Sequence, residues 1–312
     1  MAYTGTGDVS SDTAAFQQLA YFAFRSQPMY EMIADVRSTA QTHNGASVQF
    51  NIYDNMAQAT SALTEASDVT AVALGDSTVV VTLAEYGNAV ITTAKLRGTS
   101  FLNVDADAAN IIGYNMVDSV DKLVSNVANA GTNVIYAQGS MGSRPTSRVG
   151  IADAATFGAQ EGRQTVAELR GDSAPGWENG NYMAIVHPDV SYDLRGETAV
   201  TDVIQYQLYQ EGAPIRAGSI GTFNGINYIE NPRAPILDDA GATSTTNVYQ
   251  TIVVGRQALA KAFSRAPGFG EDPSVVFGPV TDTLRRFHPV GWYHLVGHAI
   301  FRQAALQRIE SS

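Results

Sequence analysis

The stretch DADAANIIGYNMVDSVDKLVSNVANA, residues 105–130, decides how the chain folds. Its apolar residues recur every three or four positions, which places them in one stripe along an α-helix. Asp105 or Asp107 is a suitable N-cap, and Gly131 follows where a left-handed residue commonly ends a helix. At 1.5 Å per residue the helix would be about 39 Å long, so we expect it to lie across a sheet. The stripe consists of Ala109, Ile112, Met116, Val120, Leu123 and Val127.

The sequence before this helix has the character of extended chain. SVQFNIYD (47–54) alternates apolar and polar residues, and STVVVTLAEYGNAVITTAKL (77–96) is rich in β-branched residues, with Gly87 as a candidate bulge. Between them, NMAQATSALTEASDVTAVALGD (55–76) is polar and small, ends in a Gly75-Asp76 turn signal and has too little apolar mass for a core. We expect a long β-hairpin that projects from the body; a disordered insertion is the alternative.

Residues 1–47 are expected to form an arm. A polar start leads into DTAAFQQLAYFAFRSQPMYEMIADV (12–36), in which Asp12 would cap a helix over 13–25 and Pro28 would end it. Five aromatic residues in this stretch need cover, which we expect from the main body or from a neighbouring subunit. They are Phe16, Tyr21, Phe22, Phe24 and Tyr30.

Residues 132–262 alternate strand and helix patterns with glycine-rich loops, which predicts a compact α/β lobe. The expected elements are a helix over 160–170, a strand over 182–187, a short helix over 189–195, a hairpin at Asn224-Gly225, a strand over 248–254 and a helix over 256–262. The Pro/Gly-rich residues 263–279 are expected to be a loop, and the chain after them is again strand-like. One face of that strand would carry Trp292, His294, Val296, His298 and Ile300, and the other Tyr293, Leu295, Ala299 and Phe301.

Composition limits the possible functions. Of 312 residues, 45% are hydrophobic and only 16% are charged, below the roughly 25% of ordinary soluble domains. Such a surface favours cover by other copies, with a weakly charged monomer as the alternative. The absence of cysteine excludes disulfides and thiolate metal sites. The net charge is −11 and the basic residues are scattered, which argues against tight binding to nucleic-acid phosphates. No apolar run approaches a membrane span, and the first ten residues do not resemble a signal peptide.

His294 and His298, in GWYHLVGH (291–298), raise the possibility of a metal-dependent enzyme. Positions four apart share a face on a helix or on a strand, so the spacing alone does not decide. A zinc site needs a third protein ligand, and HLVGH lacks the glutamate of HExxH. His43, His187 and His288 show no ligand spacing to the pair. We therefore interpret the two histidines as strand residues and expect no metal.

Other catalytic patterns are absent. There is no phosphate-binding loop, no dinucleotide fingerprint and no GxSxG motif in the sequence. Asp238-Asp239 indicates an exposed turn rather than a calcium loop. Four scattered carboxylates carry no spacing signal that would bring them together, so no catalytic or cofactor-binding residues are predicted. They are Glu161, Glu168, Glu178 and Asp189.

The order of several segments resembles a family of tailed-phage major capsid proteins with the Hong Kong 97-type fold, the coliphage N-four-like major capsid protein family. ALTEASDVTAVALGDSTVVVTLAEYGNAVITTAKL (62–96) is similar to its strand–glycine–strand block, and the long helix follows at the matching distance. Similar segments occur downstream, and together they extend over about residues 48–312. They are YMAIVHPDVSYDLRG (182–196), GSIGTFNGINYIENPRAP (218–235), VGW (290–292) and RIES (308–311).

The resemblance implies an α+β fold divided as in that family. Residues 1–47 would be the N-terminal arm, 48–80 the extended loop, 80–131 and 263–312 the peripheral domain with its spine helix, and 132–262 the axial domain. The implied function is a structural protein that assembles into hexamers and pentamers of an icosahedral shell around double-stranded DNA. An encapsulin-like compartment shell, or a metal-dependent enzyme using His294 and His298, are the alternatives.

Partners follow from the same resemblance. They are other copies of the chain, together with decoration, scaffolding and portal proteins; packaged DNA would be near the shell without specific binding, and no membrane is involved. The shell would be part of the virion and would assemble in the host cytoplasm. One relative of this fold links its subunits through a lysine on the extended loop, but residues 48–94 contain no lysine, so we expect a non-covalent shell.

Overall fold

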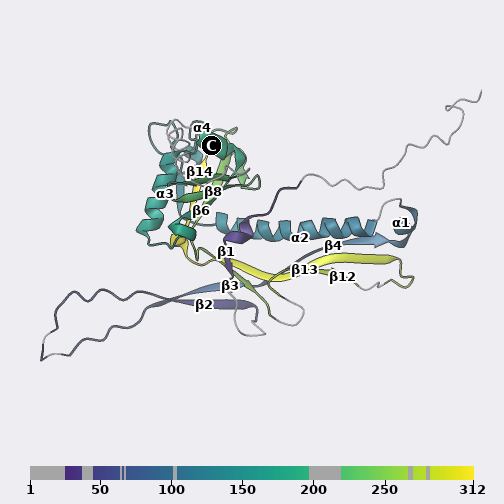
Figure 1. The fold of residues 1–312 in the computed structure, drawn as a ribbon, viewed down its shortest axis with the longest axis horizontal. Coiled ribbons are helices and arrows are strands. Elements are labelled where there is room, and N and C mark those ends of the chain that lie inside the picture. Colours follow the sequence, from purple (N-terminus) through teal and green to yellow (C-terminus); the bar gives the residue numbers. More distant parts are fainter. Residues whose placement is uncertain are drawn as a thin grey trace, which may run out of the picture.

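The computed structural model describes residues 25–36, 45–63, 65–66, 68–100, 104–196, 219–265, 270–278 and 282–312. Figure 1 shows a long helix, α2 (Val104–Asn129), beside strands β4 (Ala84–Thr93) and β13 (Phe287–Ile300), a compact lobe at one end of it, and a hairpin that projects from the body. The predicted helix 13–25, most of the arm and His43 lie outside the described residues. No helix in the described part of the chain is long and apolar enough to cross a membrane.

A five-stranded sheet underlies the long helix, and its central strand is β13. β4 pairs antiparallel with β13 along residues 287–296. On its other edge, β13 pairs antiparallel with two shorter strands that lie end to end, β12 (Ser274–Phe277) and β11 (Leu259–Phe263). A further strand, β1 (Ala34–Val36), pairs with the other edge of β11. Strand β4 leads into the short helix α1 (Ala94–Thr99).

Helix α2 lies on one face of this sheet, as its length predicted. The indole Nε1 of Trp292 donates to Asn115 Oδ1 at 2.9 Å, and the Thr92 hydroxyl donates to Asp105 Oδ1 at 3.1 Å, so side chains fix the helix to the sheet at two points. The predicted stripe is only partly correct, because Asp121 and Ser125 turn inward to meet the arm. The buried residues of the helix are Ala108, Ile112, Val120, Asp121, Val124, Ser125 and Ala128.

The compact lobe is built on a seven-stranded sheet in the order β5-β14-β10-β6-β8-β7, with β9 pairing on β10. Helices α3 (Ala159–Gly171) and α4 (Pro188–Gly196) bury Leu169 and Val190 against one face. Residues of the other face, including Ile252, pack with the end of α2 and with the arm. The strands are β5 (Val134–Tyr136), β6 (Tyr182–Val186), β7 (Ser219–Phe223), β8 (Ile226–Glu230), β9 (Ile236–Leu237), β10 (Val248–Val254) and β14 (Leu306–Ser311). Four 3-10 turns complete the described elements: η1 (Tyr30–Ile33), η2 (Arg148–Gly150), η3 (Glu178–Gly180) and η4 (Gln303–Ala305).

The predicted hairpin is confirmed. β2 (Ser47–Tyr53) and β3 (Asp76–Thr82) pair antiparallel, and a hydrogen bond of 2.9 Å from Asp54 N to Gly75 O closes the ladder. The connection between them extends far from the body without regular structure (Figure 1). The inner face of the hairpin, which includes Val48 and Val81, packs on the five-stranded sheet beside Phe301.

Three local predictions are wrong. Residues 256–262 do not form a helix: Gln257 adopts a positive φ of 65°, and the chain then enters β11, where pairing with two strands overrides the helix-forming composition. The 77–96 segment breaks at Leu83 rather than bulging at Gly87, which pairs regularly with Tyr293. The 263–279 loop contains strand β12.

Gly131 also differs from its prediction. It is not among the positive-φ glycines. A Cβ there would lie 2.7 Å from Leu306 Cδ2 of β14, so a larger residue would require the Leu306 side chain to shift. In contrast, Asn224 and Gly225 do have positive φ values, 51° and 81°, and they form the predicted two-residue turn between β7 and β8.

Candidate assembly surfaces

His294 and His298 lie on β13, on the strand face that carries Trp292, as the strand interpretation predicted. His294 is 2% exposed and His298 is half-buried, and neither Nε2 atom has a hydrogen-bond partner among the described residues. Burial first, and the neighbouring Lys261 second, lower the pKa of both histidines to about 4. Nowhere in the described ranges do three histidine, aspartate or glutamate side chains lie close enough to hold a metal ion.

Sequence reasoning missed the groups that surround these histidines. Lys261 is directly opposite His298 in the β11–β13 ladder, and its ammonium group forms an ion pair with Glu31 of η1. Lys261 is only 2% exposed, although it falls in a segment that was predicted to be helical. The sequence contains no spacing signal for this contact, because Glu31 and Lys261 are 230 residues apart.

The scattered carboxylates do not form a common site. Glu161 caps its own helix by accepting from Gly158 N at 3.1 Å, and it forms an ion pair with Arg144. Asp189 accepts from the Tyr249 hydroxyl at 2.9 Å, and burial together with that bond raises the pKa of Tyr249 to about 12. Asp239 has a positive φ of 53°, which fits the predicted turn. The side chain of Glu178 is outside the described set.

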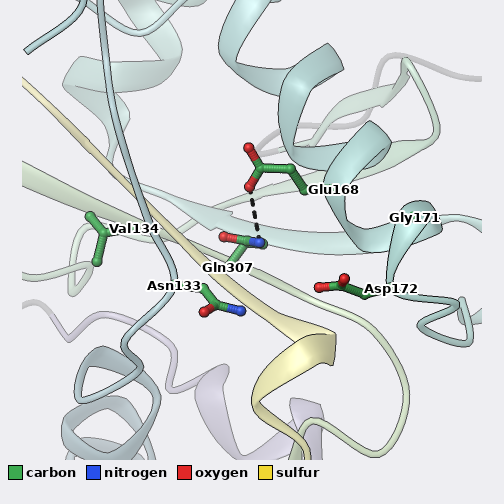
Figure 2. A pocket seen from close by; sticks show the side chains of 6 residues that line it. All are labelled: Asn133, Val134, Glu168, Gly171, Asp172 and Gln307. Carbon is green, nitrogen blue, oxygen red and sulfur yellow. Dashed lines mark hydrogen bonds between the residues drawn. The ribbon is translucent and has the colours of Figure 1, made fainter. Parts of the chain in front are cut away.

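Glu168 borders a pocket of about 450 Å³ at one end of helix α3 (Figure 2). Its carboxylate accepts from Gln164 Nε2 at 2.7 Å and from Gln307 Nε2 at 3.2 Å. The described lining contains two carboxylates, those of Glu168 and Asp172, and no histidine, lysine, serine or arginine. The lining residues are Asn133, Val134, Glu168, Gly171, Asp172 and Gln307.

The connection between β2 and β3, residues 54–75, exposes apolar side chains in its described parts, 54–63, 65–66 and 68–75. Leu63 is 76% exposed and Leu74 is 69% exposed. Single exposed apolar residues need no explanation, but a series of them on one projecting loop marks a contact surface. We call residues 54–75 the projecting loop; its other strongly exposed apolar residues are Met56, Val69 and Val72.

The outer part of the five-stranded sheet has a second exposed apolar surface, on the side away from α2. Alternate residues of β13 point away from the Trp292 side, and their cross-strand partners on β4 and β12 share that face. Ile91 is 61% exposed there, and Phe287 and Val276 are more than 40% exposed. We call this surface the open sheet face: Phe287, Pro289, Gly291 and Tyr293 of β13, Gly87, Ala89, Ile91 and Thr93 of β4, and Ser274 and Val276 of β12.

The open sheet face has small side chains at its centre. Ala89 lies opposite Gly291, and a Cβ on Gly291 would be 2.8 Å from Asn88 O. Further along β13 the same side is covered by the hairpin, since a Cβ on Gly297 would be 2.3 Å from Thr82 O. The small, apolar pattern of the uncovered part is suited to an extended chain from another molecule.

Comparison with known proteins gives one family. A family model described as "Phage capsid protein" matches residues 6–307. No curated protein sequence matches the chain.

Solved structures of phage capsids resemble the whole chain. The capsid of Ralstonia phage GP4 has a TM-score of 0.74 at 14% identity, covering 100% of this chain and 98% of that chain. The cyanophage Pam1 capsid has a TM-score of 0.74 at 13% identity, covering 99% and 97%. The capsid of Helicobacter pylori bacteriophage KHP30 has a TM-score of 0.74 at 12% identity, covering 100% and 99%. At these identities the likeness establishes the fold.

Proposed function

The chain belongs to the phage capsid protein family, and we propose that its projecting loop and open sheet face join neighbouring copies in the shell. It is a major capsid protein with the α+β, Hong Kong 97-type fold, and it self-associates into an icosahedral shell that forms part of the virion. The family membership favours a phage capsid over an encapsulin-like compartment. The proposal includes three further parts. The chain catalyses no reaction, the shell assembles from hexamers and pentamers in the host cytoplasm, and the shell encloses double-stranded DNA.

The observation that carries the proposal is the presence of two exposed apolar surfaces on the same chain. The projecting loop has small residues with intermittent Leu and Val, and the open sheet face is small at its centre with Ile91, Phe287 and Val276 around it. Each surface would lose contact with water if the loop of one copy lay on the sheet of another. Because each copy would both give a loop and receive one, contacts repeat around a ring and reinforce each other.

The family division of the chain is also part of the proposal. The arm would be residues 1–47, the extended loop 48–80, the peripheral domain 80–131 and 263–312, and the axial domain 132–262. Two strands pair across these bounds: β14 (Leu306–Ser311) belongs to the seven-stranded sheet and β11 (Leu259–Phe263) to the five-stranded one. Decoration, scaffolding and portal proteins are further proposed partners.

Loop variants test the proposal. Leu63→Asp with Leu74→Asp is expected to leave the unfolding free energy of the subunit within about 0.5 kcal/mol, because both side chains are exposed. Shell assembly, followed by sedimentation and electron microscopy, is expected to need at least about tenfold more protein, since charged side chains are costly to bury at an interface.

The matched control is Leu63→Met with Leu74→Met, which keeps both side chains apolar and is expected to assemble as the wild type does. On the open sheet face, Ile91→Asp is the disruptive variant and Ile91→Val is its matched control. Normal assembly of both aspartate variants would refute the roles given to these surfaces.

The shell is proposed to be non-covalent, since residues 48–94 have no lysine to form an amide link from the loop. Denaturing gels of assembled shells should show one band at the subunit mass, and a ladder at multiples of that mass would contradict this. The net charge of −11 supports a shell wall that does not bind the packaged DNA. Retention of free DNA by purified shells at physiological salt would count against that part.

A further inference from the structure

The base of the arm, residues 30–36, is joined to the body by four different contacts. Tyr30 N donates to Asp121 Oδ1 of α2 at 2.5 Å. Strand β1 (Ala34–Val36) pairs in parallel with β11, and Gln257 N donates to Asp35 Oδ2 at 2.7 Å. The fourth contact is the ion pair between Glu31 and Lys261. We call residues 30–36 the arm base.

The fourth contact differs from the others because it lies in a buried, basic environment. Lys261 is 2% exposed, and Glu31 is its ion-pair partner among the described residues. His298 is the cross-strand neighbour of Lys261, and His294 lies on the same face of β13 four residues earlier. A buried lysine beside two imidazoles is stable while the imidazoles are neutral, since one carboxylate then balances one positive charge.

We infer that Glu31, Lys261, His294 and His298 form an acid-sensitive latch that releases the arm base when the histidines gain protons. Protonation would place up to three positive charges, two of them on the buried Lys261 and His294, against the single, partly exposed carboxylate of Glu31. The arm base is the element that would yield, because η1 and β1 are short and β1 is an edge strand of the sheet, whereas β13 is paired on both sides. Opening would give the three basic groups access to water.

Other charged groups near the latch do not replace Glu31. Asp272, in the segment before β12, acts on His294 only at a distance. On α2, Asp118 and Asp121 are both engaged by Arg233. On β4, Glu85 lies opposite Leu295 and therefore on the other face of the sheet from His294. Glu31 is thus the carboxylate that acts on both histidines, and it is already paired with Lys261.

The direction of the pH dependence follows from the histidines. Their pKa of about 4 in the closed state is lower than the ordinary value of 6.5, so the open state binds protons more strongly. The closed state is therefore fully favoured above about pH 6.5 and loses stability as the pH falls from there towards about 4. Two such groups reduce the closing equilibrium on the order of 100-fold between about pH 7.5 and about pH 5.5.

Hydrogen exchange of the full-length chain, read by mass spectrometry, tests the latch. Protection factors for the amides of residues 30–36, corrected for the intrinsic exchange rate, are expected to fall on the order of 100-fold from about pH 7.5 to about pH 5.5. The amides of β10 and β14 should keep their protection. In His294→Gln with His298→Gln, the side chains stay neutral and the arm base should stay protected over this range.

His288→Gln is the matched control, because His288 is on the same strand but six residues from His294, and this variant should behave as the wild type. The inference is overturned if the wild type and the double variant lose protection equally. It is also overturned if the arm base keeps its protection at about pH 5.5 in the wild type, or if β10 and β14 open with it. Since exchange reads the subunit itself, these outcomes are independent of whether the loop variants assemble.

Discussion

The seven-stranded sheet is buried on both faces, whereas the outer part of the five-stranded sheet is covered on one face only. In the first, alternate residues of β6 and β10 enter two separate cores: Val253 packs under α3 and α4, and Ile252 packs towards α2 and the arm. In the second, Trp292 is buried against α2, but Ile91 on the other face is 61% exposed. The seven-stranded sheet is covered within the chain, whereas the outer part of the five-stranded sheet has one face left for the neighbouring copy that we propose.

The largest contrast is expected from truncating one isoleucine in each sheet. Ile252→Ala should lower the free energy of unfolding of the subunit by about 2–5 kcal/mol, because it removes a fully buried side chain from a packed core. Ile91→Ala should change it by about 0.5 kcal/mol or less. Denaturant unfolding followed by circular dichroism measures both, and equal losses would remove the distinction between the two sheets.

An ion pair in the compact lobe provides the second comparison. Arg148 contacts both carboxylate oxygens of Glu310, at 2.8 and 2.6 Å, and Glu310 is fully buried. Burial raises the pKa of Glu310, but Arg148, Gln250 and Arg308 outweigh it, so the pKa is lower than usual. Arg148→Met should therefore cost about 1.5–3 kcal/mol of unfolding free energy at neutral pH, and less as Glu310 gains a proton in acid. A cost unchanged by acid would contradict this assignment.

The smallest effect is expected at the far end of the five-stranded sheet. Arg97 contacts both oxygens of Asp105 in the same geometry, at 2.8 and 2.6 Å, but both side chains are about one third or more exposed. Arg97→Met should cost under about 1 kcal/mol, and salt should reduce this cost further, because water screens the pair. A cost as large as that of Arg148→Met would show that burial does not distinguish the two regions.

Local patterns predicted much of this architecture. The 3.6-residue period gave α2 to within one residue at each end, and Asn224-Gly225 gave the β7–β8 turn because only a few residue types accept a positive φ. RQALAKAF was misassigned because its residues favour helix in isolation, while β1 and β13 hold the segment as a strand. No local pattern carries information about such distant pairing.

The open sheet face and the histidine site also differ in how far the sequence predicts them. The alternating small residues around Ala89 and Gly291 are visible in the sequence and could have indicated an uncovered sheet face. The surroundings of His294 and His298 could not, because Glu31 and Lys261 are 230 residues apart and are brought together by the parallel pairing of β1 with β11. The four-residue spacing of the histidines suggested a metal site, whereas the proposed latch depends on their position beside Lys261.

The most direct test of the account is an electron cryo-microscopy reconstruction of shells assembled from the full-length chain. The account predicts residues 54–75 of each copy lying on the open sheet face of a neighbour, with Ile91 and Phe287 covered by that loop. A closed shell in which the loop extends into solvent and the open sheet face stays bare would contradict it.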